Sequence, residues 1–204
     1  MSFTTVPDRA PGYALSAAGD WDVIQQNLNQ GAIAVIEQLE LTSQSDLYFQ
    51  GADFLGIPQT FQHLMIVASI RSKTAALLDS CNLRFNGDFA GNYDGQYMYS
   101  NAGSSVAVQY FASSSIFTGE CVGSTAPAGY FSTHYIFIPN YYRTDMDKTA
   151  IYRTSMTCYT TTTYCRIHTG AGWWRSTAAI TDMSLGLGGT NFEPGTRAIL
   201  LGLP

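Results

Sequence analysis

The sequence predicts a mainly β protein, an antiparallel β-sandwich preceded by an extended arm with one short α-helix. Segments in which apolar and polar residues alternate recur from Asp53 to the C-terminus, and turns rich in Gly, Ser, Asn and Thr separate them. A helical spacing of apolar residues does not recur after Gly31. About eight strands without intervening helices indicate a sandwich and exclude a parallel α/β sheet.

The composition agrees with one compact domain and excludes several other classes of protein. Only 12% of the 204 residues are charged, whereas 46% are hydrophobic and 13% are aromatic. A disordered chain has the opposite balance, and a coiled coil needs many more charged residues. No apolar stretch approaches the roughly 18 residues of a membrane-spanning helix, so we expect no membrane insertion. The N-terminus shows no pattern of a secretory signal.

The charge distribution divides the chain into an acidic arm, residues 1–45, and a nearly neutral β domain, residues 46–204. Five of the 15 acidic residues lie in the arm, together with one of the 10 basic residues. Phosphate backbones require clustered cations, and the chain has no basic run, so we expect no nucleic-acid partner. A surface rich in Ser, Thr, Asn, Tyr and Gly is typical of proteins that pack against copies of themselves or lie outside the cell.

The arm has the pattern of an attachment segment. Residues 1–16 contain two prolines and no hydrophobic period, and apolar residues at helical spacing then predict a short helix over about 20–30. Residues 32–41 are compatible with an extension of this helix or with a strand. Because so short a helix is unstable alone, its apolar side must dock on another surface. The predicted partner-binding anchors of the arm are Phe3, Tyr13, Leu15, Trp21, Ile24 and Leu28.

Eight segments of the domain have the pattern of strands. The clearest is 63–72, in which apolar residues alternate with a second set on the opposite face. Segment 81–88 contains Asn86-Gly87, a dipeptide that favours a tight turn. Pro194-Gly195 predicts another turn before the terminal strand. The remaining predicted strands are 105–112, 129–141, 150–161, 163–170, 181–188 and 196–203.

The cysteines and histidines predict neither a disulfide scaffold nor a metal site. Four cysteines are too few for a scaffold in a chain of this length. Cys158 and Cys165 flank the segment YTTTTY, and a hairpin turn centred on Thr161–Thr162 would place them opposite each other, although two reduced thiols are the favoured interpretation. The chain has no CxxC motif and its three histidines are scattered, so we expect no metal and no cofactor.

No motif of the domain predicts catalysis, and we predict a protein that is not an enzyme. A glycosidase needs two carboxylates roughly 5–10 Å apart. Glu120, expected in a loop, and Glu193, expected in a turn, are the two glutamates of the domain, and their spacing gives no reason to bring them together. His63 and His134 lie in apolar strands, as buried or edge histidines do. The segment DMDK at 145–148 falls short of a calcium loop.

The tyrosines of the domain have two interpretations. Tyrosine has a flat apolar face and a polar edge, so these residues could stack on sugars. They could also lie between sheets or between subunits, where tyrosine is enriched, and we favour subunit interfaces. The tyrosines concerned are Tyr93, Tyr97, Tyr99, Tyr110, Tyr130, Tyr135, Tyr141 and Tyr142.

Five segments in order, covering nearly all of 54–204, resemble a domain found in many structural proteins of tailed bacteriophages. They are FLGIPQTFQHLMIVASIRS (54–72), LRFNGD (83–88), NYDGQYMYSNAG (92–103), IFIPNYYRTDMDKTA (136–150) and GAGWWRSTAAITDMSLGLGGTNFEPGTRAILLGL (170–203). The resemblance implies a β-sandwich or jelly-roll module attached to tail fibres, baseplates or other parts of the virion, without an established activity.

The hypothesis from the sequence is therefore a non-enzymatic structural component of a tailed-bacteriophage virion, associated with tail, baseplate or fibre. We expect it in the virion, bound to other virion proteins through its arm and to itself, as a homotrimer. Two alternatives remain open, a capsid decoration (cement) protein and a module that binds a host surface glycan. An enzyme that hydrolyses surface polysaccharide ranks last.

Trp21 is predicted to be the main anchor of the arm, because it lies on the apolar stripe of the predicted helix. Truncating a buried interface tryptophan costs about 2–4 kcal/mol, so Trp21→Ala should weaken attachment to particles roughly 30- to 1000-fold. The melting temperature of the β domain should not change. A lowered melting temperature with normal retention on particles would instead assign Trp21 to packing on its own domain.

Overall fold

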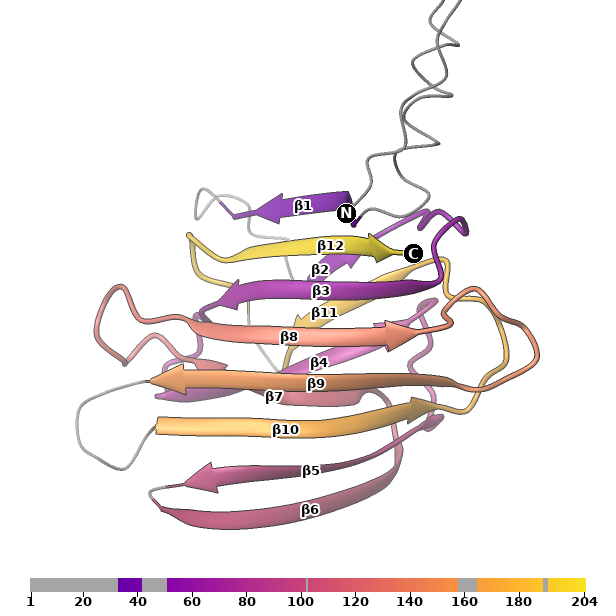
Figure 1. The fold of residues 1–204 in the computed structure, drawn as a ribbon. Helices are drawn as coiled ribbons and strands as arrows, with labels where there is room; N and C mark the ends of the chain where they lie inside the picture. The colour runs from indigo at the N-terminus through magenta and orange to yellow at the C-terminus, as the bar shows by residue number, and fades with distance from the viewer. Residues whose placement is uncertain (1–32, 42–50, 102, 158–164, 189–190) are drawn as a thin grey trace, which may run out of the picture. The chain divides into compact units, whose positions relative to one another are not determined.

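The computed structural model describes residues 33–41, 51–101, 103–157, 165–188 and 191–204. These residues form twelve β-strands, and no helix occurs among them (Figure 1). Within the same ranges there is consequently no helix long and apolar enough to cross a membrane.

Several predictions from the sequence fall outside the described residues. They are the short helix over 20–30, the hairpin turn between Cys158 and Cys165, and all the arm anchors, which are Phe3, Tyr13, Leu15, Trp21, Ile24 and Leu28. These stay predictions.

The twelve strands cover most of the described chain. They are β1 (Ala34–Glu40), β2 (Gly51–Phe54), β3 (His63–Ile70), β4 (Leu78–Phe85), β5 (Tyr93–Asn101), β6 (Ser104–Ser113), β7 (Ile116–Val122), β8 (Ser132–Pro139), β9 (Lys148–Thr157), β10 (Cys165–Trp174), β11 (Met183–Leu187) and β12 (Arg197–Leu203).

The strands form two antiparallel sheets that pack against each other, so the predicted antiparallel β-sandwich is confirmed (Figure 1). One sheet has eight strands in the order β1-β12-β3-β8-β9-β10-β5-β6, and it faces the viewer in Figure 1. The other has four strands in the order β2-β11-β4-β7 and lies behind it. The first sheet is therefore twice as wide as the second.

Each of the eight predicted strands corresponds to an observed strand, and β1, β2, β5 and β7 are additional. β1 settles the open interpretation of residues 32–41 in favour of a strand. Two of the additional strands contain a glycine that interrupts the alternation of apolar and polar residues, Gly95 in β5 and Gly119 in β7. The sequence pattern therefore did not predict them. β7 also contains a bulge against β4, which shifts the alternation by one residue.

The core follows from the alternation of apolar residues along the strands. On β3, Leu64, Ile66 and Ile70 are fully buried between the sheets, as the sequence pattern predicts. Burying such a side chain contributes about 1.5–3 kcal/mol to stability. The core continues through Phe85, Tyr152, Trp174, Leu185 and Leu200.

The predicted turn at Asn86-Gly87 carries the chain from one sheet to the other. Both residues have positive φ, 50° at Asn86 and 63° at Gly87, and the N–H of Asp88 donates to the carbonyl of Phe85 over 3.0 Å. The Asp88 carboxylate accepts a 2.7 Å hydrogen bond from Nε1 of the buried Trp174. This bond ties the corner after β4 to the end of β10.

The described sandwich begins at residue 33, although the sequence analysis places residues 34–40 in the arm. β1 pairs with β12 along its whole length and forms one edge of the eight-stranded sheet. Ile36 and Leu39 pack against the core, and Leu41 is buried. These three residues therefore add apolar side chains to the core of the sandwich.

We predict that residues 33–204 fold without the preceding residues. A chain starting at Ile33 should have the urea midpoint of the full chain. A chain starting at Ser45 lacks β1 and should be less stable by about 2–4 kcal/mol, because it loses three apolar side chains from the core. Equal midpoints for the two shortened chains would place the boundary at residue 45.

Candidate functional site

A row of polar side chains crosses the inner face of the eight-stranded sheet, where apolar residues would be expected. His134 on β8 pairs with Thr154 on β9, Thr154 with His168 on β10, and His168 with Tyr99 on β5. His134, Thr154 and His168 are at most 1% exposed. The row faces β7 of the other sheet, and its buried polar side chains are the first candidates for a functional site.

His134 has hydrogen-bond partners at both ring nitrogens. Its Nδ1 lies 3.0 Å from Thr154 Oγ1, which donates its own proton to the carbonyl of Thr118 over 2.6 Å. Thr154 Oγ1 can thus accept a hydrogen from Nδ1. Nε2 lies 3.8 Å from Cys81 Sγ and 2.9 Å from Ser132 Oγ, which also donates to the carbonyl of Ile70 over 3.0 Å.

The protonation states of this cluster do not suit catalysis. Burial lowers the pKa of His134 to about 3, so its ring is neutral. Burial, together with the neighbouring Cys121, raises the pKa of the Cys81 thiol well above its ordinary value. A reactive cysteine needs the thiolate form and access to substrate, and this pair has neither. The role of His134 is to satisfy polar groups inside the core.

A second polar cluster lies beside the first, at Glu120 on β7. The Glu120 carboxylate accepts hydrogen bonds from Arg166 Nη1 and from His168 Nε2, the latter over 3.2 Å. Burial acts to raise the pKa of Glu120, but the hydrogen bonds and the charges of these two partners outweigh it and lower the pKa overall. Glu120 is thus held as a carboxylate, which is the wrong form for a general acid.

Aromatic rings surround this second cluster. The ring of Tyr99 stacks on His168 with centroids 5.3 Å apart, and the guanidinium of Arg166 lies 5.4 Å from the centroid of the same ring. Tyr97 packs against Phe117, with centroids 4.6 Å apart. We call Tyr97, Tyr99, Phe117, Glu120, Arg166 and His168 the aromatic edge. It lies between β7 of the smaller sheet and the neighbouring strands β10 and β5 of the larger one.

The catalytic candidates of the sequence do not form a site. The expectation of a loop at Glu120 is wrong, because this residue lies in β7 and its carboxylate is engaged by Arg166 and His168. Glu193 lies in the turn before β12, and its N–H donates to the carbonyl of Arg71 over 2.8 Å. No two-carboxylate arrangement links the side chains of these glutamates among the described contacts.

The remaining candidates have structural positions. His63 is half-buried on β3, and its Nδ1 accepts the N–H of Asn140 over 3.1 Å. Asp145 forms an ion pair with Arg143. No group of three or more His, Cys, Asp or Glu side chains that could hold a metal ion occurs within the described ranges. Cys81 and Cys121 are both free and buried.

Most of the singled-out tyrosines are not free to stack on a ligand. Tyr93 and Tyr141 are fully buried, and Tyr97, Tyr99, Tyr110 and Tyr130 are half-buried. Tyr135 and Tyr142 are exposed. The interpretation that tyrosines lie between the sheets therefore fits the buried and half-buried tyrosines, which outnumber the two exposed ones.

The outer surface of the eight-stranded sheet is the feature that the sequence analysis missed. Trp173, Tyr135 and Ile151 point away from the core and are 41%, 52% and 51% exposed. Sequence reasoning could have found this surface, because several predicted strands have apolar residues on both faces. We call the following residues the outer apolar face: Met65, Val67, Met98, Tyr135, Phe137, Ile151, Ile167, Trp173, Ile199 and Leu201.

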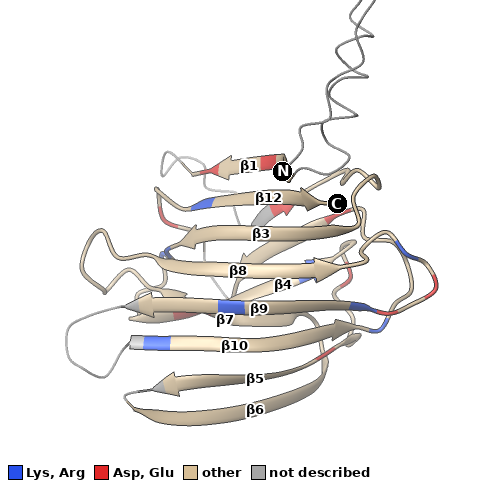
Figure 2. Cartoon of the chain, in the orientation of Figure 1, with Lys and Arg blue, Asp and Glu red and all other residues tan. Residues whose placement is uncertain are grey.

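Very few charges interrupt the outer apolar face (Figure 2). Arg197 at one corner forms a 2.7 Å ion pair with Glu40, and Asp94 at another lies 3.5 Å from Arg175. Between these corners, Arg153 on β9 is the one charged outward-pointing side chain of the described strands. A sheet face of this kind is suited to contact with protein.

Comparisons with known proteins give no match: no protein-family model, no curated protein and no solved structure corresponds to this chain.

We predict that His134 makes the fold sensitive to acid. Its contribution is complete above about pH 6.5 and declines as the pH falls toward 3, because the unfolded chain then binds a proton that the folded chain does not, with a slope of up to about 1.4 kcal/mol per pH unit. Urea unfolding of His134→Gln between pH 7 and pH 4 should show a smaller loss of stability than the wild type. Thr154→Val is the control, since it weakens the network at every pH and retains the histidine. Parallel curves for the wild type and His134→Gln would contradict the prediction.

Proposed function

We propose that this chain is a non-enzymatic structural component of a tailed-bacteriophage virion, associated with tail, baseplate or fibre. The observation that carries the proposal is the order of the strands, which can be understood as a jelly roll with two inserted hairpins. Jelly rolls of eight strands in two sheets are common in viral capsid proteins and lectins.

The hairpins β5–β6 and β9–β10 are the proposed insertions. Without them, the larger sheet has the order β1-β12-β3-β8 and the smaller one β2-β11-β4-β7. Numbered afresh along the chain from one to eight, these orders are 1-8-3-6 and 2-7-4-5. The chain passes from one sheet to the other at every step except from four to five, as in a jelly roll. Both hairpins add to the same side of one sheet, next to β8.

The polar clusters support a role without catalysis. His134 is neutral and enclosed, with partners at both nitrogens, and Glu120 is held by Arg166 and His168. The His134 ring and the Glu120 carboxylate are thus engaged by other groups of the fold, whereas Nδ1 of the buried His168 has no hydrogen-bond partner among the described residues. A rigid sandwich of this kind can present binding surfaces without doing chemistry.

The proposed partners are other virion proteins and further copies of the chain, as a homotrimer. The arm anchors from Phe3 to Leu28 would bind the neighbouring virion proteins. Attachment to the capsid surface as a decoration protein is an alternative, because jelly rolls also occur on heads. Binding of a host glycan is the second alternative, which the exposed rings of Tyr135, Tyr142 and Trp173 favour.

The position in the virion can be tested with antibodies raised against residues 33–204. Gold-labelled antibody viewed by electron microscopy on purified particles should mark the tail, baseplate or fibres. Label on the head would favour the decoration protein. Particles without label, from a lysate in which the same antibody detects the free protein, would overturn the proposal of a virion component.

We predict that Glu120→Gln and Glu193→Gln leave infection and particle assembly unchanged, and that the purified protein releases no sugar from surface polysaccharide. Glu120→Gln should lower the stability by about 1–3 kcal/mol, because Arg166 and His168 lose their charged partner in a partly buried site. Glu193→Gln is the matched control and should melt like the wild type. Sugar release that either substitution abolishes would establish an enzyme.

A further inference from the structure

We infer that the outer apolar face is an interface between copies of this chain. The inference names a surface for the self-association that the proposed function includes, and it can be tested in solution without particles. An antiparallel sheet with one free face normally carries polar residues on that face. Here β12, β3 and β8 carry mainly apolar residues at their outward positions.

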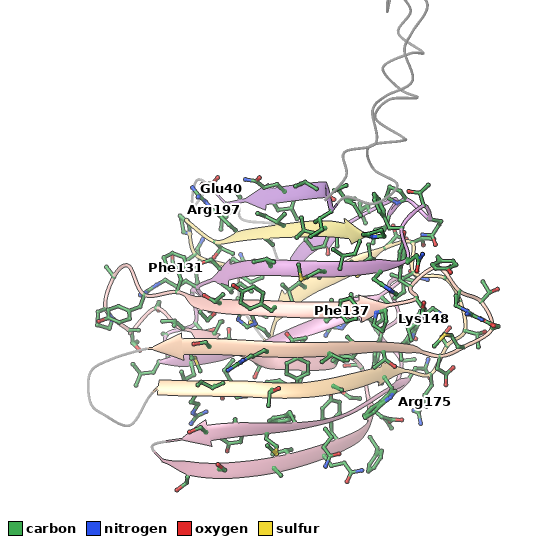
Figure 3. All side chains as sticks on the ribbon, in the orientation of Figure 1. Glu40, Phe131, Phe137, Lys148, Arg175 and Arg197 are labelled. Atoms are coloured by element: carbon green, nitrogen blue, oxygen red, sulfur yellow. The ribbon has the colours of Figure 1, made fainter. Side chains whose placement is uncertain are left out.

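The apolar residues of four adjacent strands are direct cross-strand neighbours, whereas Ile167 and Trp173 on the next strand pair with the polar residues Ser155 and Thr149. Leu201 pairs with Met65, Met65 with Phe137, and Phe137 with Ile151, across β12, β3, β8 and β9. Figure 3 labels Phe137 on β8 in the middle of this sheet. Single exposed hydrophobic residues are common on proteins, whereas a contiguous patch marks a site of interaction.

The dimensions of the face agree with a protein partner. The residues of the face lie on six neighbouring strands, from β12 to β5. With strands about 4.8 Å apart and a run from Ile167 to Trp173 at about 3.3 Å per residue, the face spans roughly 24 Å by 20 Å. The resulting area is roughly 480 Å² on each copy, so two copies would together bury close to the ~1,000 Å² that a specific protein interface needs. Tyr135 and Trp173 are residue types that dominate binding energies at such interfaces.

Charge favours a copy of the same chain over a charged partner. The Glu40–Arg197 pair and the Asp94–Arg175 pair are each neutral and lie at corners, so they do not repel a second copy. Arg153 is a single charge, and it can stay in contact with water when a second copy binds. A flat apolar surface also lacks the convergent hydrogen-bond donors and acceptors that orient a sugar.

The test is the mass of the full chain in solution, measured by sedimentation as a function of concentration. The wild type should associate. Ile151→Glu places a charge in the centre of the face and should weaken association at least about 30-fold, with an unchanged melting temperature. Leu55→Glu is the matched control, because Leu55 is an apolar residue in the loop after β2 that is even more exposed than Ile151, and it should associate like the wild type.

A second measurement tests the interface without any substitution. Hydroxyl-radical footprinting should show Tyr135 and Trp173 protected in the associated wild type and reactive after dilution to monomers, whereas Leu55 should react in both.

Ile167→Glu replaces Ile151→Glu if the latter does not fold. A wild type that stays monomeric, or an Ile151→Glu variant that associates normally, overturns the inference. A monomer in which both rings are protected would show instead that the arm of the same chain covers the face. Normal antibody labelling of particles with monomeric protein would overturn this inference alone and leave the virion proposal standing.

Discussion

The unequal width of the two sheets is the constraint on which the rest of the structure depends. A four-stranded sheet cannot cover the inner face of an eight-stranded one, so the strands beyond β7 must be covered by their own side chains. Glycines make this possible. A Cβ at Gly95 would lie 2.3 Å from the hydroxyl of Tyr110, and one at Gly170 would lie 2.5 Å from that of Tyr152, so both tyrosines lie directly over backbone. Large aromatic side chains thereby replace a missing layer of sheet.

The same constraint explains why polar groups collect at β7. This strand is the edge of the smaller sheet, and the interior changes there from a two-layer core to a single layer of aromatic rings. Arg166 and Glu120 neutralise each other at this boundary, where each is still partly exposed, whereas His168 is fully enclosed beside them. Full desolvation of the ion pair would cost more than its attraction returns, and partial exposure reduces that cost. Farther inside, His134 is neutral, which agrees with the absence of any charged partner among its hydrogen-bond contacts.

The fold could be predicted from the sequence where local patterns determine it, and the site could not. Alternation along β3 gave the correct strand and the correct buried face, and Asn86-Gly87 gave the correct turn. The contact of Glu120 with Arg166 depends on the packing of β7 against β10, which belong to different sheets, and no local pattern contains it. The outer apolar face depends on strand order, because Met65, Phe137 and Ile151 are far apart in the sequence and become neighbours only through pairing. The pattern of β5 was obscured by Gly95, whose purpose is evident only once Tyr110 lies on it.

An open edge strand offers a second route to self-association, and the structure works against it. β6 is an edge strand of ten residues without a charge or a proline, which is the kind of edge that invites pairing with another chain. Its register with β5 shifts between Tyr93 and Gly95, and Ala112 has a φ of 51°, so the end of the strand is bent away from a regular ladder. The Ala112 N–H is also satisfied, because it donates to the Asp94 carboxylate over 2.9 Å. At the opposite edge, Glu37 places a negative charge on β1, and a bulge between Val35 and Glu37 interrupts the regular ladder. With both edges of the larger sheet discouraged from pairing, the self-association that we propose would use the outer apolar face, where contact between copies can be closed and limited.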